Sequence, residues 1–122
     1  RRQRVLLRRK SITPRFASSF LWVRAQGFFS NSNAGTPAMI MALFKDSGAD
    51  ALKTAFVSEA VTTAIVWMAI DYWVAAASVT ARTYKIRAGA NAAGTTTFNG
   101  ISGVAEMGGT LNSFLEIREI VP

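Results

Sequence analysis

The 122-residue sequence contains neither cysteine nor histidine. Without cysteine there is no disulfide framework, no thiolate metal site and no thiol nucleophile. Without histidine the usual general base, the commonest metal ligand and the usual partner of a catalytic serine are all missing. These two absences remove most hydrolytic and metal-dependent chemistry. The sequence therefore predicts a protein that is not an enzyme and that has no cofactor, no catalytic residues and no metal site.

Charged residues are also scarce, at 17% of the chain, whereas 50% of the residues are hydrophobic. A typical soluble domain is about 25% charged. The length fits a single domain, and this domain has little polar material with which to cover its own surface. We therefore expect apolar area to be buried against partner subunits or against a membrane.

The net charge of +7 comes entirely from the first fifteen residues, because the seven basic and seven acidic residues after position 15 cancel. Residues 1–10 are expected to form a basic N-terminal arm or a first strand, and residues 11–122 the folded domain. No aromatic residue lies among these cations to stack on bases, which argues against a nucleic-acid contact. Docking on an acidic surface fits better, and an unstructured terminus is the alternative. The candidate docking residues are Arg1, Arg2, Arg4, Arg8, Arg9, Lys10 and Arg15.

Short apolar runs separated by clusters of Gly, Asn, Ser and Pro predict an all-β domain. Residues 82–88 give the cleanest alternation, with Tyr84 and Ile86 on one face and Lys85 and Arg87 on the other. Asn99-Gly100 is the strongest hairpin signal. Further strands are expected within residues 5–12, 20–29, 38–45, 53–58, 95–98 and 113–121.

Residues 61–79 contain a single charge, Asp71, and are long enough to cross a bilayer as a helix. The cost of a central aspartate roughly cancels the favourable insertion of the Val and Ile residues. A strand accounts better for the same residues, with an apolar face of Ala64, Val66, Met68, Ile70, Tyr72 and Val74. The opposite face is mixed, and its members Ile65, Trp67, Ala69 and Trp73 are the predicted subunit interface. Together with Trp22, its tryptophans form either a ligand platform or part of a core or interface.

Two pairs of carboxylates are weak candidates for chemistry. Asp46 and Asp50 flank a Ser-Gly-Ala sequence, but their spacing predicts a turn between strands rather than a calcium loop. Glu116 and Glu119 fall on opposite faces of a predicted strand, so they are not expected to work as an acid/base pair.

The order of the segments resembles a module of tailed-phage virion surface proteins, found in capsid decoration or cement proteins and in the tips of tail and head fibres. The matching pieces are residues 11–14 (SITP), 17–23 (ASSFLWV), 42–47 (ALFKDS), 83–89 (TYKIRAG), 98–100 (FNG) and 108–120 (GGTLNSFLEIREI). The resemblance implies an antiparallel, jelly-roll-like β-sandwich that forms a homotrimer on the outer surface of a virion.

The leading hypothesis is therefore a non-enzymatic virion structural protein that docks on the capsid shell or sits at a fibre head. Deleting residues 1–10 is expected to weaken its association with the particle and to leave the domain folded. One alternative is the knob of a tail fibre that binds a host receptor or glycan through the loops at 30–37, 89–94 and 102–109. A second is a small helical membrane protein built on residues 61–79. A nucleic-acid partner and a membrane partner are both disfavoured.

Overall fold

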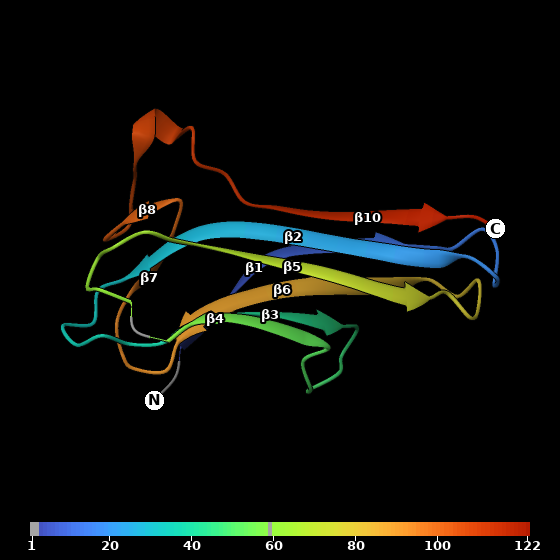
Figure 1. Ribbon diagram of the computed structural model, residues 1–122, viewed down its shortest axis with the longest axis horizontal. Coiled ribbons are helices and arrows are strands. Elements are labelled where there is room, and N and C mark those ends of the chain that lie inside the picture. Colours follow the sequence, from blue (N-terminus) through green and yellow to red (C-terminus); the bar gives the residue numbers. More distant parts are fainter. Residues whose placement is uncertain (1–2, 59) are drawn as a thin grey trace.

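The computed structural model describes the backbone of residues 3–58 and 60–122, with side chains from Arg8 onward in these ranges. Two antiparallel sheets form two layers, with the strands running along the long axis of the molecule (Figure 1). The first sheet has the order β1 (Gln3–Ile12), β6 (Arg82–Ala90), β3 (Met39–Lys45), β4 (Lys53–Val57). The second has the order β10 (Phe114–Ile120), β2 (Phe20–Asn31), β5 (Val66–Ala75), and β7 (Thr96–Phe98) also pairs with β2. The predicted all-β, antiparallel sandwich is confirmed.

The core lies between the two layers and is built from the alternating inward residues of each strand. Leu21, Val23 and Phe29 of β2 are completely buried, and they pack in one cluster with buried residues of the first sheet. Tyr84 belongs to this cluster, and burial raises the pKa of its phenol. The other large core side chains from the first sheet are Met39, Met41, Leu43 and Ile86.

The expected alternation in β6 and β5 is observed. Tyr84, Ile86 and Ala88 are buried, while Lys85 and Arg87 are partly exposed on the other face. The apolar stretch at residues 61–79 forms β5 with its flanking loops. In the part of the chain that the structure describes, no helix has the length and apolarity needed to span a membrane.

Residues 3–12 form β1, an edge strand of the first sheet. It pairs with β6 from Gln3↔Ala90 to Ile12↔Arg82, with a bulge between Leu6 and Arg8. An unstructured terminus therefore does not describe this segment. Removing residues 1–10 would strip most of the strand from β6, contrary to the expectation that the domain stays folded without them. Arg1 and Arg2 lie outside the described residues.

The prediction of a hairpin turn at Asn99-Gly100 is wrong. The chain reverses instead at Ser102-Gly103, which both have positive φ (49° and 80°) and connect β8 (Gly100–Ile101) to β9 (Val104–Ala105). Gly100 is needed for a different reason, because a Cβ at this position would lie 1.9 Å from the carbonyl oxygen of Val104. This small hairpin and the 3₁₀ turn η1 (Met107–Gly109) project beyond the second sheet (Figure 1).

Candidate functional site

The outer face of the second sheet carries the most unusual surface of the molecule. Strand pairing places Trp22 of β2 opposite Trp73 of β5, and Phe28 opposite Trp67. Trp67 is 55% exposed and Trp73 is 52% exposed, although large apolar side chains normally find a covered position. We call this surface the aromatic face; its outward residues are Phe20, Trp22, Arg24, Gln26, Phe28, Trp67, Ala69, Asp71, Trp73, Phe114, Glu116, Arg118 and Ile120.

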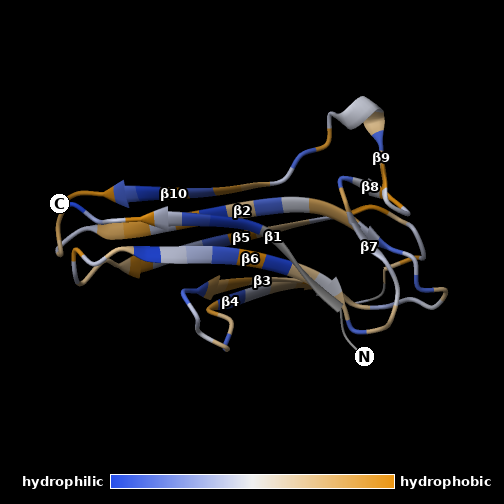
Figure 2. Cartoon of the chain, turned by 180° about the vertical axis from the view of Figure 1, so that it is seen from behind, coloured by the Kyte–Doolittle hydropathy of each residue, from blue (hydrophilic) through white to orange (hydrophobic). Residues whose placement is uncertain are grey.

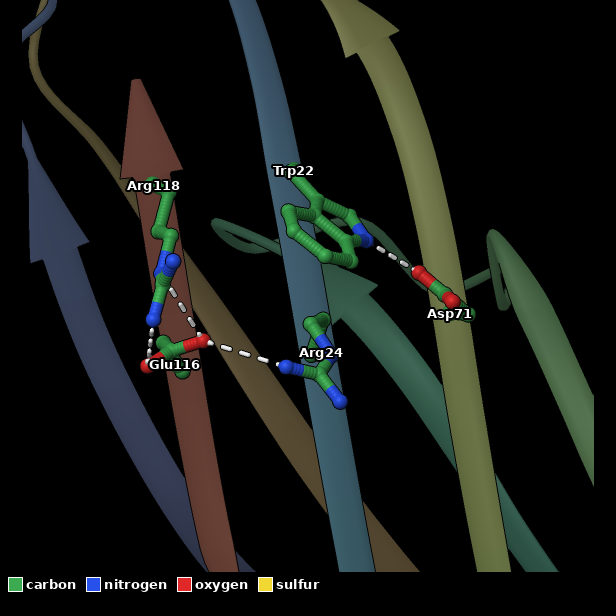
Figure 3. A network of polar contacts seen from close by, with 5 residues as sticks. All are labelled: Trp22, Arg24, Asp71, Glu116 and Arg118. Atoms are coloured by element: carbon green, nitrogen blue, oxygen red, sulfur yellow. Dashed lines mark hydrogen bonds and ion pairs between the residues drawn. The ribbon is translucent and has the colours of Figure 1, made fainter. Parts of the chain in front are cut away.

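Towards one end of the aromatic face two indole rings stack on each other. The ring centroids of Trp22 and Trp73 are 4.9 Å apart and the rings are 13° from parallel. The guanidinium groups of Arg24 and Arg118 lie 4.8 and 5.9 Å from the Trp22 ring centroid, within the range of cation–π attraction. The indole Nε1 of Trp22 donates a hydrogen bond to Asp71 Oδ1 (Figure 3). These contacts hold the ring pair in one orientation while leaving much of it exposed.

The charges on the aromatic face balance one another. Glu116 Oε1 lies 3.7 Å from Arg24 Nη1 and 3.2 Å from Arg118 Nε, in two partly exposed ion pairs. With Asp71, the face carries two carboxylates and two guanidinium groups, all within Figure 3. The surface is therefore locally neutral and rich in aromatic area. Glu119 lies on the other side of β10, so the two glutamates do not form an acid/base pair.

Three of the four residues predicted for the interface lie on this face. Trp67, Ala69 and Trp73 are exposed on β5, and Met68 and Ile70 between them are buried. Ile65 precedes the strand and is partly buried. Sequence reasoning missed the contribution of β2, where Phe20 and Phe28 share the face with Trp22. The even spacing of these aromatic residues along residues 20–28 was the signal that could have identified them.

The predicted docking cations separate into two places. Arg8, Arg9 and Lys10 line a cavity of about 320 Å³ together with residues 113–115, at the seam between β1 and β10. Arg8 Nη2 donates a hydrogen bond to the Ser113 carbonyl oxygen (3.2 Å). Arg4 belongs to the same strand as these cations, and its backbone pairs with Gly89 of β6.

Arg15 lies apart from this cavity, in the loop that follows β1. Its backbone N–H donates to both carboxylate oxygens of Glu119 at 2.9 Å. The same carboxylate accepts hydrogen bonds from the Phe16 N–H (3.2 Å) and the Ser19 hydroxyl (2.7 Å). These bonds, that from Arg15 first, lower the pKa of Glu119 below its ordinary value. Glu119 therefore fastens the loop to β10, and Arg15 serves this loop rather than the basic cavity.

Within residues 3–58 and 60–122, no group of three or more acidic side chains is placed to hold a metal ion. Asp46 belongs to the turn after β3, where its Oδ1 accepts a hydrogen bond from the Thr83 N–H (2.8 Å).

Comparison of the sequence with known proteins does not assign the chain to a family. No protein-family model and no curated protein matches it.

Proposed function

We propose that this chain is a non-enzymatic structural subunit of a phage virion, which assembles as a homotrimer on the outer surface of the particle. The observation that carries the proposal is the aromatic face. This face presents two cross-strand aromatic pairs, Trp22–Trp73 and Phe28–Trp67, and both Trp67 and Trp73 are exposed. Large exposed apolar groups gathered on one face of a small domain mark an interaction site. Aromatic residues and arginine are also the types enriched at the centres of protein interfaces.

The balance of charge supports a second copy of the same chain as the occupant of this face. Asp71 and Glu116 lie close to Arg24 and Arg118, so a neighbouring copy can offer opposite charges to each without a net repulsion. The stacked Trp22 and Trp73 rings are already ordered, so that covering them costs little side-chain entropy. The number of three copies follows from the resemblance to virion modules.

That resemblance also supports the place of the protein in the virion. Its closing piece, residues 108–120, ends in β10, which forms one border of the aromatic face. Its other pieces include residues of β2, the central strand of the face, among them Trp22. Two of the six segments that resemble the phage module thus contribute to the proposed subunit contact, and β5 completes this contact from outside them.

The cations at the β1–β10 seam are the proposed contact with the particle. Arg8, Arg9 and Lys10 line one cavity, and none of the described residues that line it carries a carboxylate. An acidic patch of a shell protein would bring the missing negative charge. In this arrangement the aromatic face joins the subunits and the neighbouring basic seam attaches them to the shell.

The proposal is tested by locating the protein in particles released from cells that carry its gene. We expect peptide mass spectrometry to detect the chain in purified particles, and native mass spectrometry of the isolated protein to give three copies. The double substitution Arg9→Glu/Lys10→Glu should reduce its occupancy on particles, while Lys45→Glu, a charge reversal on the exposed end of β3, should not. A chain that is abundant in the lysate and absent from the particles would contradict the proposal.

A further inference from the structure

The outer face of the first sheet, opposite to the aromatic face, holds a groove that the proposed assembly does not use. Phe44 and Ala42 point away from the core but are only 7% and 8% exposed. They are covered because the loop between β3 and β4 folds back over this side of the sheet (Figure 1). Its closure is fixed by the hydrogen bonds Gly48 N–H to Lys45 O (3.0 Å) and Leu52 N–H to Leu43 O (2.7 Å).

Two adjoining hollows lie between this loop and β6. One has a volume of about 350 Å³ and is lined by an apolar floor of Ile40 and Ala42, by the carboxylate-bearing Asp50 and by Thr54. The other, of about 270 Å³, is lined by Asp46 and Lys85. Phe44, Ala49 and Arg87 line both hollows, which therefore adjoin each other; the groove is the pair of them. Its size is that of a small-ligand site.

Two cations, Lys85 and Arg87, line one wall of the groove. Lys85 and Arg87 point to the same side of β6, and Arg9 of β1 lies directly opposite Lys85. Like charges in directly opposed positions destabilise a sheet. Among the side chains that the structure describes, the ion pairs gather on Glu116 and none reaches these three cations. Figure 2 shows the resulting hydrophilic positions along β6. An anionic group in the groove would relieve this repulsion.

The aspartates on the opposite wall of the groove restrict which anions can bind there. Asp50 and Asp46 would repel a nucleic acid or a polyphosphate, whose negative charge is spread along its whole length. A sugar acid carries one carboxylate and several hydroxyls. Its carboxylate would meet Arg87 and Lys85, and its hydroxyls would donate to Asp50 and exchange hydrogen bonds with Thr54. The apolar floor would contact the face of the sugar ring.

We propose that this groove binds a carboxylate-bearing sugar, a hexuronic acid unit of an acidic polysaccharide. The two sheets present their outer faces in opposite directions, so this site stays open when the aromatic face is covered. The inference does not depend on the proposed subunit contact, because it rests on another face. Arg9, which also lines the cavity at the β1–β10 seam, enters both arguments.

The test is calorimetric titration of the full chain with a hyaluronan tetrasaccharide, in which glucuronate alternates with a neutral amino sugar. We expect a dissociation constant on the order of 1 mM or tighter, and no binding of neutral chitotetraose. Arg87→Ala should weaken binding about tenfold or more, because it removes a charge-assisted hydrogen bond. Lys10→Ala, a cation of the same sheet on the other side of β1, is the matched control and should bind like the wild type.

Asp50→Asn tests the opposite wall with a change in an exposed loop that does not threaten the fold, and it should also weaken binding. Wild-type affinity in both Arg87→Ala and Asp50→Asn would overturn the proposal. Sodium triphosphate binding as tightly as the tetrasaccharide would reduce the groove to a general anion site and overturn the sugar assignment. The absence of any binding up to about 10 mM tetrasaccharide would overturn it as well.

Discussion

Replacing Trp67 by serine is the sharpest test of the aromatic face. Trp67 lies opposite Phe28 on the outer side of β5, six residues along the strand from Trp73 and therefore well away from the Trp22–Trp73 stack. The substitution therefore removes exposed aromatic area and leaves the stacked pair and its ion pairs in place. We expect a protein that folds and no longer assembles.

The size of the effect follows from the exposed area. A large aromatic side chain offers up to about 250 Å², and Trp67 is 55% exposed. About 140 Å² per subunit would therefore be covered on assembly, worth at most about 3.4 kcal/mol at roughly 25 cal/mol per Å². This energy corresponds to a loss of two to three orders of magnitude in the association constant for each contact.

The assay is sedimentation velocity over a concentration series from nanomolar to hundreds of micromolar. Phe56→Ser is the matched control, since Phe56 is 66% exposed on β4, in the other sheet. It loses a similar aromatic area from the opposite side of the molecule and should leave the sedimenting mass unchanged. Circular dichroism of both variants verifies that the sandwich is intact.

Two results would refute the reasoning. The first is a wild-type chain that remains monomeric at hundreds of micromolar, because the aromatic face would then be a surface without a second copy. The second is an equal loss of assembly in Trp67→Ser and Phe56→Ser, which would show that apolar area in general, and not this face, drives association.

Three further predictions concern the fold. Deleting residues 1–10 should lower the thermal unfolding temperature steeply or prevent soluble expression, because β6 loses one of its two pairing partners and keeps only β3; an unchanged melting curve would contradict the pairing of β1. Glu119→Gln should lower the melting temperature at pH 7. Because the pKa of Glu119 is depressed below the ordinary value of 4.5, its stabilisation is complete above that pH and is lost as the pH falls through the folded-state pKa. The gap to the wild type should therefore close in acid, and a gap that is constant with pH would refute this role. Gly100→Ala should shift the amide signals of the β8–β9 hairpin, since its Cβ would meet the Val104 carbonyl; a spectrum unchanged around Val104 would argue against that close approach.

The sequence predicted the elements whose side chains alternate strictly. In β5 the order of Trp67, Met68, Ala69 and Ile70 already separates the buried face from the exposed one, because the pleat has a period of two residues. The same is true of β6. These signals are local, so one segment is enough to read them.

Features that depend on which strand pairs with which could not be read in this way. The cations of residues 4–10 gave no apolar alternation, and their place as an edge strand is set by β6, far along the chain. The stack of Trp22 on Trp73 requires the register of β2 against β5. The turn at Ser102-Gly103 replaced the one expected at Asn99-Gly100, because the pairing of β8 with β9 decides which residues reverse the chain.

The pairing of β1 with β6 has a consequence for folding during synthesis on the ribosome. The first residue of β6 follows the last residue of β1 by 70 positions (12 to 82). At a translation rate of roughly 5–20 residues per second, β1 is synthesised roughly 4–14 seconds before β6 begins to appear. A strand dense in positive charge repels its counterparts on neighbouring nascent chains during that interval. The arginines of β1 would thus prevent nascent chains on the same mRNA from pairing with one another through this strand before each chain has formed its own β1–β6 pair.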